Sequence, residues 1–284
     1  MKSFEEIIEY LDHYWSKFGC VLLQPYTTEV AAGTLHPATV MKAIQNETWR
    51  AAYLQPSIRP ADCRFASNPN RLYQHHQYQV ILKPSPENLQ DLYIKSLAGL
   101  GIDPKENDIK FIKDDWKNPS IGAHGLGWEI RCNGMEISQF TYMQKIGGID
   151  CIAGELAYGL ERIAMHIQEV ETIFDIKWNN KGTKYGDLFL ENEKSFSAYA
   201  AEYADIEFLT SSFISIQDAC NILLEKDLSE AAYDQCLKAC HILNLLESRK
   251  GLSTTEHASY MAKVRNMAKN CCYKALNKVN TNEQ

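Results

Sequence analysis

The spacing of apolar residues predicts a helix at the start of the chain. Ile7, Leu11 and Trp15 recur every four residues and would share one face of that helix. Ser3 and Glu6 form a capping box, in which each side chain accepts a hydrogen bond from the other residue's backbone amide. Gly19 is suited to end the helix, because glycine readily adopts the left-handed conformation found there. The pattern therefore predicts an amphipathic helix that packs on a core.

Alternating apolar and polar residues predict a hairpin over residues 128–139, turning at Asn133-Gly134. The expected register pairs Cys132 with Met135, Arg131 with Glu136, Ile130 with Ile137, and Glu129 with Ser138. Alternation then gives one apolar face and one polar face, the polar one carrying Glu129, Arg131, Glu136 and Ser138. A solvated sheet surface explains such a polar face about as well as an active site does.

Helix-breaking residues divide the chain into two parts. All nine prolines lie at or before Pro119, and Gly251 is the single glycine after Gly186. The end of the chain therefore lacks helix breakers almost entirely, while the earlier part is rich in turns. We expect a mixed α+β domain over residues 1–190, with an antiparallel sheet flanked by helices, and an all-helical domain over residues 191–284.

The composition is that of a globular protein, with 45% hydrophobic and 23% charged residues. No apolar run approaches the ~20 residues that cross a bilayer, and the acidic N-terminus does not resemble a signal peptide. We therefore expect a cytoplasmic protein without a membrane partner. The nine cysteines form no CxxC pair, so we expect reduced, mostly buried thiols and no zinc.

The net charge of −7 limits how the chain can contact nucleic acid. A protein that binds nucleic acid over a wide surface normally has a basic face. The most basic stretch is 247–278, which contains seven lysines or arginines and only two acidic residues. This stretch is either a solvated helix face or a docking surface for another protein chain or for RNA. If the substrate is a nucleic acid, most of its binding surface is expected on another chain.

Two arginine-centred stretches carry the candidate chemistry. The first runs from 54 to 82 and contains Arg59, Asp62, a polar loop with Arg71, and an apolar strand. The second runs from 154 to 162 and ends in Glu161-Arg162. A phosphate-binding GxxxxGK[ST] loop, a GxGxxG fingerprint, and the HIGH and KMSKS sequences are all missing.

These two stretches resemble motifs 2 and 3 of class II aminoacyl-tRNA synthetases. The runs QVILKPSPENLQDLY, DDWKNPS, NGMEISQFTY, YGLER and HILNLLESRKGLSTTE further resemble the α subunits of bacterial two-chain glycyl-tRNA synthetases over nearly the whole chain. The resemblance implies a glycine–tRNA ligase that uses ATP and Mg²⁺. It also implies an α–α homodimer that joins a larger β chain in an α2β2 assembly and charges tRNA(Gly).

The resemblance also assigns roles to individual residues. Arg59 would bind the α-phosphate of ATP and Arg162 the γ-phosphate, and these two arginines would be catalytic. A guanidinium suits both tasks, because it is planar, always charged and bidentate. The full set of implied ATP-binding residues is Arg59, Asp62, Arg71, Tyr78 and Arg162. Asp62 stands where the class usually has glutamate, and Tyr78 takes the adenine-stacking position where the family more often has phenylalanine.

The polar face of the hairpin is the candidate glycine site. Glycine offers only an ammonium and a carboxylate, so its pocket needs acidic side chains. We assign Glu129, Glu136 and Ser138 to the ammonium, with Glu136 as an alternative ligand of Mg²⁺. Two other functions stay open: a class II relative that adenylates another small acid, and a non-catalytic regulatory or scaffold protein. The presence of both Arg59 and Arg162 argues against the second, because such a protein has no need of phosphate-binding arginines.

Overall fold

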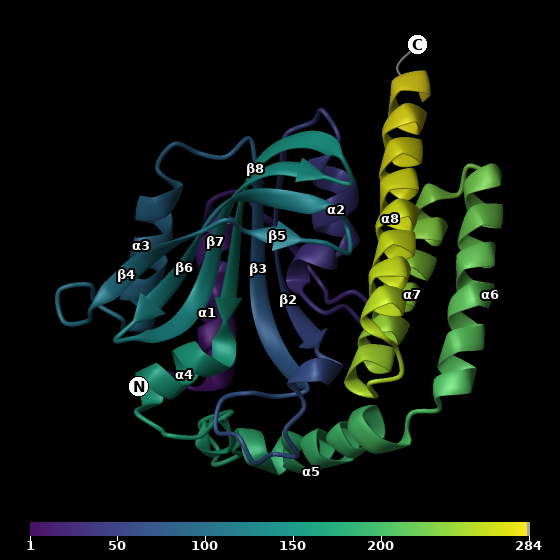
Figure 1. Ribbon diagram of the computed structural model, residues 1–284. Helices are drawn as coiled ribbons and strands as arrows, with labels where there is room; N and C mark the ends of the chain where they lie inside the picture. The colour runs from purple at the N-terminus through teal and green to yellow at the C-terminus, as the bar shows by residue number, and fades with distance from the viewer. Residues whose placement is uncertain (283–284) are drawn as a thin grey trace.

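One large sheet with helices on both faces forms the first two thirds of the protein, and long helices follow (Figure 1). The computed structural model describes residues 1–282. The strands are β1 (Val21–Leu23), β2 (Trp49–Ile58), β3 (Gln74–Lys83), β4 (Ile109–Asp114), β5 (Lys117–Asn118), β6 (Ala123–Cys132), β7 (Met135–Ile146) and β8 (Ile149–Gly159). The helices are α1 (Phe4–Lys17), α2 (Pro37–Ala43), α3 (Leu89–Leu100), α4 (Leu160–Gln168), α5 (Tyr185–Ala198), α6 (Ile206–Glu225), α7 (Ser229–Ser248) and α8 (Thr254–Asn282). Short helical turns are η1 (Gly33–Leu35), η2 (Pro60–Asp62), η3 (Ile173–Asp175) and η4 (Tyr199–Tyr203).

The sheet has the strand order β1-β2-β3-β8-β7-β6-β4, with β5 paired to β6. Every pairing is antiparallel except that of β1 with β2. The hairpins β6–β7 and β7–β8 join neighbours in sequence by tight turns, and β3 meets β8 from the far part of the chain. The expected α+β architecture, an antiparallel sheet flanked by helices and followed by a helical region, is confirmed.

Helices α1, α3 and α4 cover one face of the sheet. The capping box predicted for α1 is present, with Ser3 N donating to Glu6 Oε2 at 2.8 Å and Glu6 N donating to Ser3 Oγ at 3.3 Å. Leu11 and Trp15 of α1 are fully buried against this face. Apolar burial of this kind contributes most of the stability of a short amphipathic helix.

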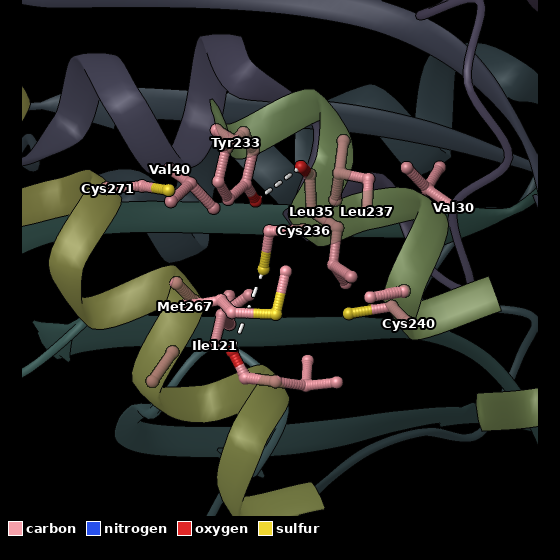
Figure 2. Packing of buried hydrophobic residues seen from close by; sticks show 14 of the residues in the cluster. Val30, Leu35, Val40, Ile121, Tyr233, Cys236, Leu237, Cys240, Met267 and Cys271 are labelled. Carbon is pink, nitrogen blue, oxygen red and sulfur yellow. Dashed lines mark hydrogen bonds between the residues drawn. The ribbon is translucent and has the colours of Figure 1, made fainter. Parts of the chain in front are cut away.

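The opposite face packs on α2 and on the helical region, in one continuous hydrophobic cluster. Figure 2 shows Tyr233 of α7 beside Leu35, and the Tyr233 hydroxyl donates to the Leu35 carbonyl oxygen at 2.8 Å. The helices after α5 therefore share their core with the sheet. The boundary expected at residue 190 falls inside α5, and a division into two domains there stays a prediction.

The hairpin between β6 and β7 has the predicted turn but not the whole predicted register. Cys132 pairs with Met135 and Arg131 with Glu136, as expected. A register shift follows, so that Ile130 pairs with Ser138 and Glu129 with Gln139. Ile137 is thus the extra residue of a β-bulge, and the pairings predicted for Ile137 and Ser138 are wrong.

All nine cysteines are free and buried. Among the residues that the structure describes, no helix combines the length and the apolar character needed to span a bilayer.

Candidate active site

A cavity of about 430 Å³ opens in the sheet face beside the ends of β2 and β8 and the start of β3. Of the residues predicted to form the site, six line this cavity: Arg59, Asp62, Arg71, Glu136, Ser138 and Arg162. The lining is mostly polar and carries both positive and negative side chains, so the cavity suits a charged ligand.

Arg59 is held at the point where β2 ends. Pro60 follows it and stops the strand, because proline cannot donate to a sheet and its ring fixes the backbone angle φ. The Arg59 amide donates to the Tyr73 carbonyl oxygen at 2.7 Å, and its side-chain Nε donates to the Ala31 carbonyl oxygen at 2.8 Å. Burial lowers the pKa of the Arg59 guanidinium, while the negative charges of Asp62 and Glu136 oppose that shift. The cation is therefore fixed in direction and partly removed from water.

Arg162 lies in the first turn of α4, which begins directly where β8 ends. Gly159 stands at the junction, where a Cβ would lie 3.3 Å from the backbone oxygen of Ile137. The Arg162 guanidinium donates to the Glu136 backbone oxygen at 3.1 Å and to its carboxylate at 3.0 Å. This contact joins α4 to the start of β7 and holds the guanidinium at the cavity wall.

Arg71 and Asp62 lie at the outer edge of the cavity. The two side chains form an ion pair at 3.7 Å across the loop that joins η2 to β3. Both are substantially exposed, so the pair adds little to stability. Asn68 shapes the loop, because its side-chain oxygen accepts the amide of Arg71 at 2.9 Å.

Two of the predicted site residues, Tyr78 and Glu129, are not part of the cavity lining. Tyr78 is fully buried under the sheet, where its hydroxyl donates to Asp12 of α1 at 2.7 Å. Its ring faces α1 and cannot stack on a base bound in the cavity, so that prediction is wrong. Glu129 pairs with Arg131 of its own strand at 2.8 Å and is not part of the cavity lining. Its cross-strand partner Gln139 does line the cavity, so the assignment of Glu129 to a glycine site stays a prediction.

Ser138 borders the cavity, but its side chain points elsewhere. Its cross-strand partners are Ile130 and Tyr158, both of them fully buried core residues. Side chains directly opposite each other share a face of the sheet. The hydroxyl predicted to bind glycine therefore points into the core, because the bulge at Ile137 reverses the alternation.

His75 takes the place in the cavity that was expected for Tyr78. It lies three residues earlier on β3, and side chains an odd number of positions apart in a strand point to opposite faces. Burial, and next the nearby charge of Arg59, lower the pKa of His75 to about 3. The ring is therefore a neutral imidazole that can stack on a base.

Glu155 of β8 is the most perturbed acid of the cavity, and sequence analysis did not identify it. Its side chain lines the cavity and is only 2% exposed. Burial raises its pKa to about 8, although hydrogen bonds from Thr34 and Gln79 oppose the shift. The Gln79 side-chain oxygen is itself buried without a hydrogen-bond partner. The Gln79 side-chain nitrogen donates a hydrogen bond to the Glu155 carboxylate, so the acid and the amide oxygen lie together inside the sheet.

Glu161 fixes β3 against α4 beside the two arginines. Its carboxylate accepts hydrogen bonds from the His76 backbone amide at 2.7 Å and from the Tyr185 hydroxyl at 3.0 Å, and it lies 2.8 Å from His76 Nδ1. Burial alone would raise the pKa of Glu161, but the contacts with His76 lower it below its usual value. This charged acceptor holds in register the two elements that present His75 and Arg162.

The cavity does not contain a preformed metal site. Within residues 1–282, no group of three or more His, Cys, Asp or Glu side chains is placed to hold a metal ion. The Glu136 carboxylate is already engaged by Arg162. A magnesium ion commonly takes one or two carboxylates and completes its shell with phosphate oxygens and water. Glu136 fits that arrangement only as a single protein ligand of an ion that arrives with a nucleotide.

The antiparallel sheet, with one arginine where β2 ends and another where β8 passes into α4, is the arrangement expected of a class II aminoacyl-tRNA synthetase. The family described as "Glycyl-tRNA synthetase alpha subunit" matches residues 4–280. The chain therefore belongs to the glycyl-tRNA synthetase alpha subunit family.

Individual relatives agree with this family. Proteins named glycine–tRNA ligase alpha subunit from Rickettsia bellii (strain OSU 85-389) and Rickettsia canadensis (strain McKiel) are 52% and 51% identical to this chain over 280 residues. Each match covers 96% of this chain and 97% of the relative. A solved pyrrolysyl-tRNA synthetase from Desulfitobacterium hafniense matches with a TM-score of 0.45 and 10% identity, over 65% of this chain and 77% of that one.

Proposed function

We propose that this chain activates glycine with ATP and, together with a larger β chain, transfers it to the 3′ end of tRNA(Gly). The observation that carries the proposal is that Arg59 and Arg162 line one cavity, each fixed by hydrogen bonds that it donates to a different part of the chain. A regulatory or scaffold protein has no use for two fixed cations at one polar site.

The two arginines match the charge changes of adenylate formation. A carboxylate oxygen of glycine attacks the α-phosphorus of ATP, the bond to the bridging oxygen breaks, and pyrophosphate leaves with that electron pair. Negative charge grows on the α-phosphate oxygens as this happens. Arg59, which is partly desolvated, is the residue we assign to those oxygens. Arg162 and Arg71 are assigned to the phosphates that leave as pyrophosphate.

His75 is the ring that we assign to the adenine base. It lines the same cavity as the arginines and is held neutral by burial and by the charge of Arg59. A neutral ring can stack on a base without adding a second positive charge beside Arg59. Asp62 stays a candidate for a contact with the base edge, because it also lines the cavity.

Glu155 is the group that we assign to the glycine ammonium in place of Ser138, and Glu129 stays a second candidate because it pairs with the cavity-lining Gln139. An ammonium donates hydrogen bonds and carries a charge, and Glu155 and Gln79 supply buried acceptors. Gln77 and Thr34 line the cavity beside Glu155, and Gln77 Oε1 accepts the Gly33 amide at 2.8 Å. With these side chains fixed around Glu155, a bulkier amino acid would have to displace them.

Mg²⁺ bound with the nucleotide would supply further positive charge at the phosphates. We keep Glu136 as the single protein ligand for it, because Glu136 lines the cavity and is partly exposed. In the absence of nucleotide, the same carboxylate orients Arg162.

The test of the proposed function is ATP–pyrophosphate exchange with each amino acid in turn, with and without the β chain. We expect glycine to be the one amino acid that supports exchange. Exchange with another acid would make the chain a relative that adenylates a different substrate. No exchange with any amino acid in the presence of the β chain would favour the non-catalytic alternative.

The α2β2 assembly, with an α–α homodimer inside it, is a second part of the proposal. Large apolar side chains remain exposed on η4 and α6, with Tyr203 at 74%, Phe208 at 65% and Ile222 at 57%. Apolar residues gathered on one segment are typical of a protein–protein interface. Sedimentation of the α chain alone and with the β chain tests the stoichiometry. We also propose a cytoplasmic location, supported by nine free thiols; cell fractionation tests it.

A further inference from the structure

A basic stripe runs along one side of α8. Arg265, Lys269 and Tyr273 follow one another at intervals of four residues and are all exposed, so their side chains share one helix face. The Lys269 ammonium lies 5.6 Å from the centre of the Tyr273 ring. We call these three residues the α8 stripe. It combines two cations and an exposed aromatic ring in a protein whose net charge is −7.

The α8 stripe is joined directly to the mouth of the cavity. Lys117 and Asn118 of β5 line the cavity, and the next residue, Pro119, accepts a hydrogen bond from Arg265 Nε at 2.8 Å. The Ser120 hydroxyl also reaches α8, donating to Met261 Sδ at 3.6 Å. Figure 1 shows α8 alongside the sheet on the side of β5. The side chain of Arg265 is therefore fixed over the loop that leads out of the cavity.

The turn between β7 and β8 borders the other end of the α8 stripe. A Cβ placed on Gly148 would lie 3.9 Å from the Tyr273 hydroxyl oxygen. Lys145 in the same hairpin is exposed and pairs with Asp150 at 3.1 Å. The stripe thus follows the seam between α8 and the sheet, from the cavity mouth to the β7–β8 turn.

Other basic residues of the 247–278 stretch are engaged within the protein. Arg249 donates to the Ala201 and Ala204 carbonyl oxygens, at 2.7 and 2.9 Å. Lys274 pairs with Asp227 at 2.5 Å, and the Lys263 ammonium lies 4.9 Å from the centre of the Tyr260 ring. Arg265 and Lys269 differ from these residues in their position, because Arg265 is hydrogen-bonded to Pro119, next to the cavity lining, and Lys269 lies one turn away on the same helix face.

We propose that the α8 stripe binds the single-stranded 3′ end of the RNA substrate as it enters the cavity. The inference rests on the proposed function, because transfer of glycine requires the terminal ribose of the RNA to reach the bound adenylate. A single strand that enters past β5 passes over Pro119 and next to Arg265. Arg265 and Lys269 contact its phosphates, and the Tyr273 ring offers a surface on which a base stacks.

The side-chain types fit single-stranded RNA better than a protein partner. Proteins bind single strands with a cationic track for the backbone and aromatic rings for the bases, and such binding weakens strongly with salt. Because Arg265 Nε is fixed on Pro119, its planar guanidinium is already oriented and loses little freedom on meeting a phosphate.

The test uses the α chain purified with its β chain and a fluorescent RNA minihelix that carries the acceptor stem and single-stranded 3′ end of tRNA(Gly). The variant is Arg265→Gln with Lys269→Gln, since glutamine at 265 can still donate to Pro119. The matched control is Lys95→Gln with Lys105→Gln, an equal charge change at two exposed lysines in α3 and in the loop after it. Both variants should retain glycine-dependent pyrophosphate exchange within about twofold, since activation needs no RNA contact.

We expect the stripe variant to bind the minihelix roughly tenfold more weakly and to lose about 0.7 of the log–log salt slope for each phosphate contact removed. Tyr273→Leu should weaken binding roughly fivefold or more without changing that slope. Equal binding and equal slopes for the stripe variant and the control would overturn the proposal. Loss of co-sedimentation with the β chain would also overturn it, assigning the stripe to the protein partner. Failure of the wild-type complex to catalyse exchange would instead count against the proposed function.

Discussion

The guanidinium of Arg162 is bound to both the backbone oxygen and the carboxylate of Glu136, at 3.1 and 3.0 Å. The first residues of α4 and β7 are therefore tied together at the cavity wall. A carboxylate beside a phosphate-binding arginine fixes the direction of that arginine before the nucleotide arrives. Once phosphate oxygens bind Arg162, they compete with the Glu136 carboxylate for its guanidinium. The Arg162–Glu136 ion pair is therefore expected to affect catalysis more than stability.

Glu136→Gln is expected to lower kcat for glycine-dependent exchange by up to about a hundredfold, because a small displacement of a positioned charge is costly to catalysis. The side chain is partly exposed, so the melting temperature should change little. Ile137→Val, at the neighbouring buried bulge, is the control and should cost only ~0.5–1.5 kcal/mol of stability with normal exchange. Exchange kinetics and thermal unfolding on both variants make the comparison. An unchanged kcat for Glu136→Gln would show that the ion pair does not orient Arg162 for the reaction.

Arg59→Ala and Arg162→Ala are each expected to lower exchange by ~10²–10⁴, since each removes a charge directed at the phosphates. Arg71→Ala is the comparison, because Arg71 lies at the outer edge of the cavity and its side chain pairs with Asp62. Its loss should raise the KM for ATP and affect kcat less. Near-normal exchange in the Arg59 or Arg162 variant, with an unchanged melting temperature, would remove that arginine from the catalytic site.

His75 and Tyr78 separate the two assignments of the base-stacking ring. His75→Ala should weaken ATP binding by the equivalent of about 1–3 kcal/mol, which is the usual contribution of an aromatic ring stacked on a base. Tyr78→Phe removes the hydroxyl that donates to Asp12 and should cost about 1–3 kcal/mol of stability, with no change in the KM for ATP. ATP titration by calorimetry and thermal unfolding measure both effects. If the two variants exchanged these properties, the placement of β3 relative to the cavity would be wrong.

Local features of the sequence predicted local structure well. The capping box at Ser3 depends on residues three positions apart, and it is present. The Asn133-Gly134 turn is also determined by neighbouring residues. Both residues adopt the positive φ that the turn requires. The bulge at Ile137 was not predictable in the same way. It depends on how β7 fits between β6 and β8, and those strands are assembled by contacts along the whole sheet.

The error at Tyr78 came from matching an aromatic residue to a motif without following the alternation along the strand. His75 and Gln77 line the cavity, so the residues of β3 that face it are the odd-numbered ones. His75, Gln77 and Gln79 form a polar series on that face, a signal that the sequence did contain. Glu155 was missed for a different reason. The candidate role of Glu155 depends on its burial beside Gln79, which is 76 residues away along the chain.

Glu155→Gln tests the ammonium site through its dependence on pH. The pKa of Glu155 is about 8 in the folded protein and close to its ordinary value of 4.5 in the unfolded chain. Between these values the folded state holds a proton that the unfolded state has lost, so wild-type stability falls as the pH rises from 4.5 to 8. The glutamine that replaces Glu155 in the variant does not titrate. The melting temperature of Glu155→Gln should therefore exceed that of the wild type increasingly across this range.

The same variant should be unable to use glycine. In the proposed site the ammonium of glycine binds the ionised form of Glu155, so below pH 8 each binding event must first remove a proton from the carboxyl group. The wild-type KM for glycine should thus fall by about tenfold for each unit of pH gained below that pKa, and level off above it. Calorimetry in buffers of different ionisation enthalpy should show about one proton released per glycine bound at pH values well below that pKa. A glycine KM that is independent of pH, or a Glu155→Gln variant that exchanges normally, would place the ammonium elsewhere in the cavity. The glycine KM and the proton release therefore identify the ammonium site, because the gain in stability follows from burial of the carboxyl group alone.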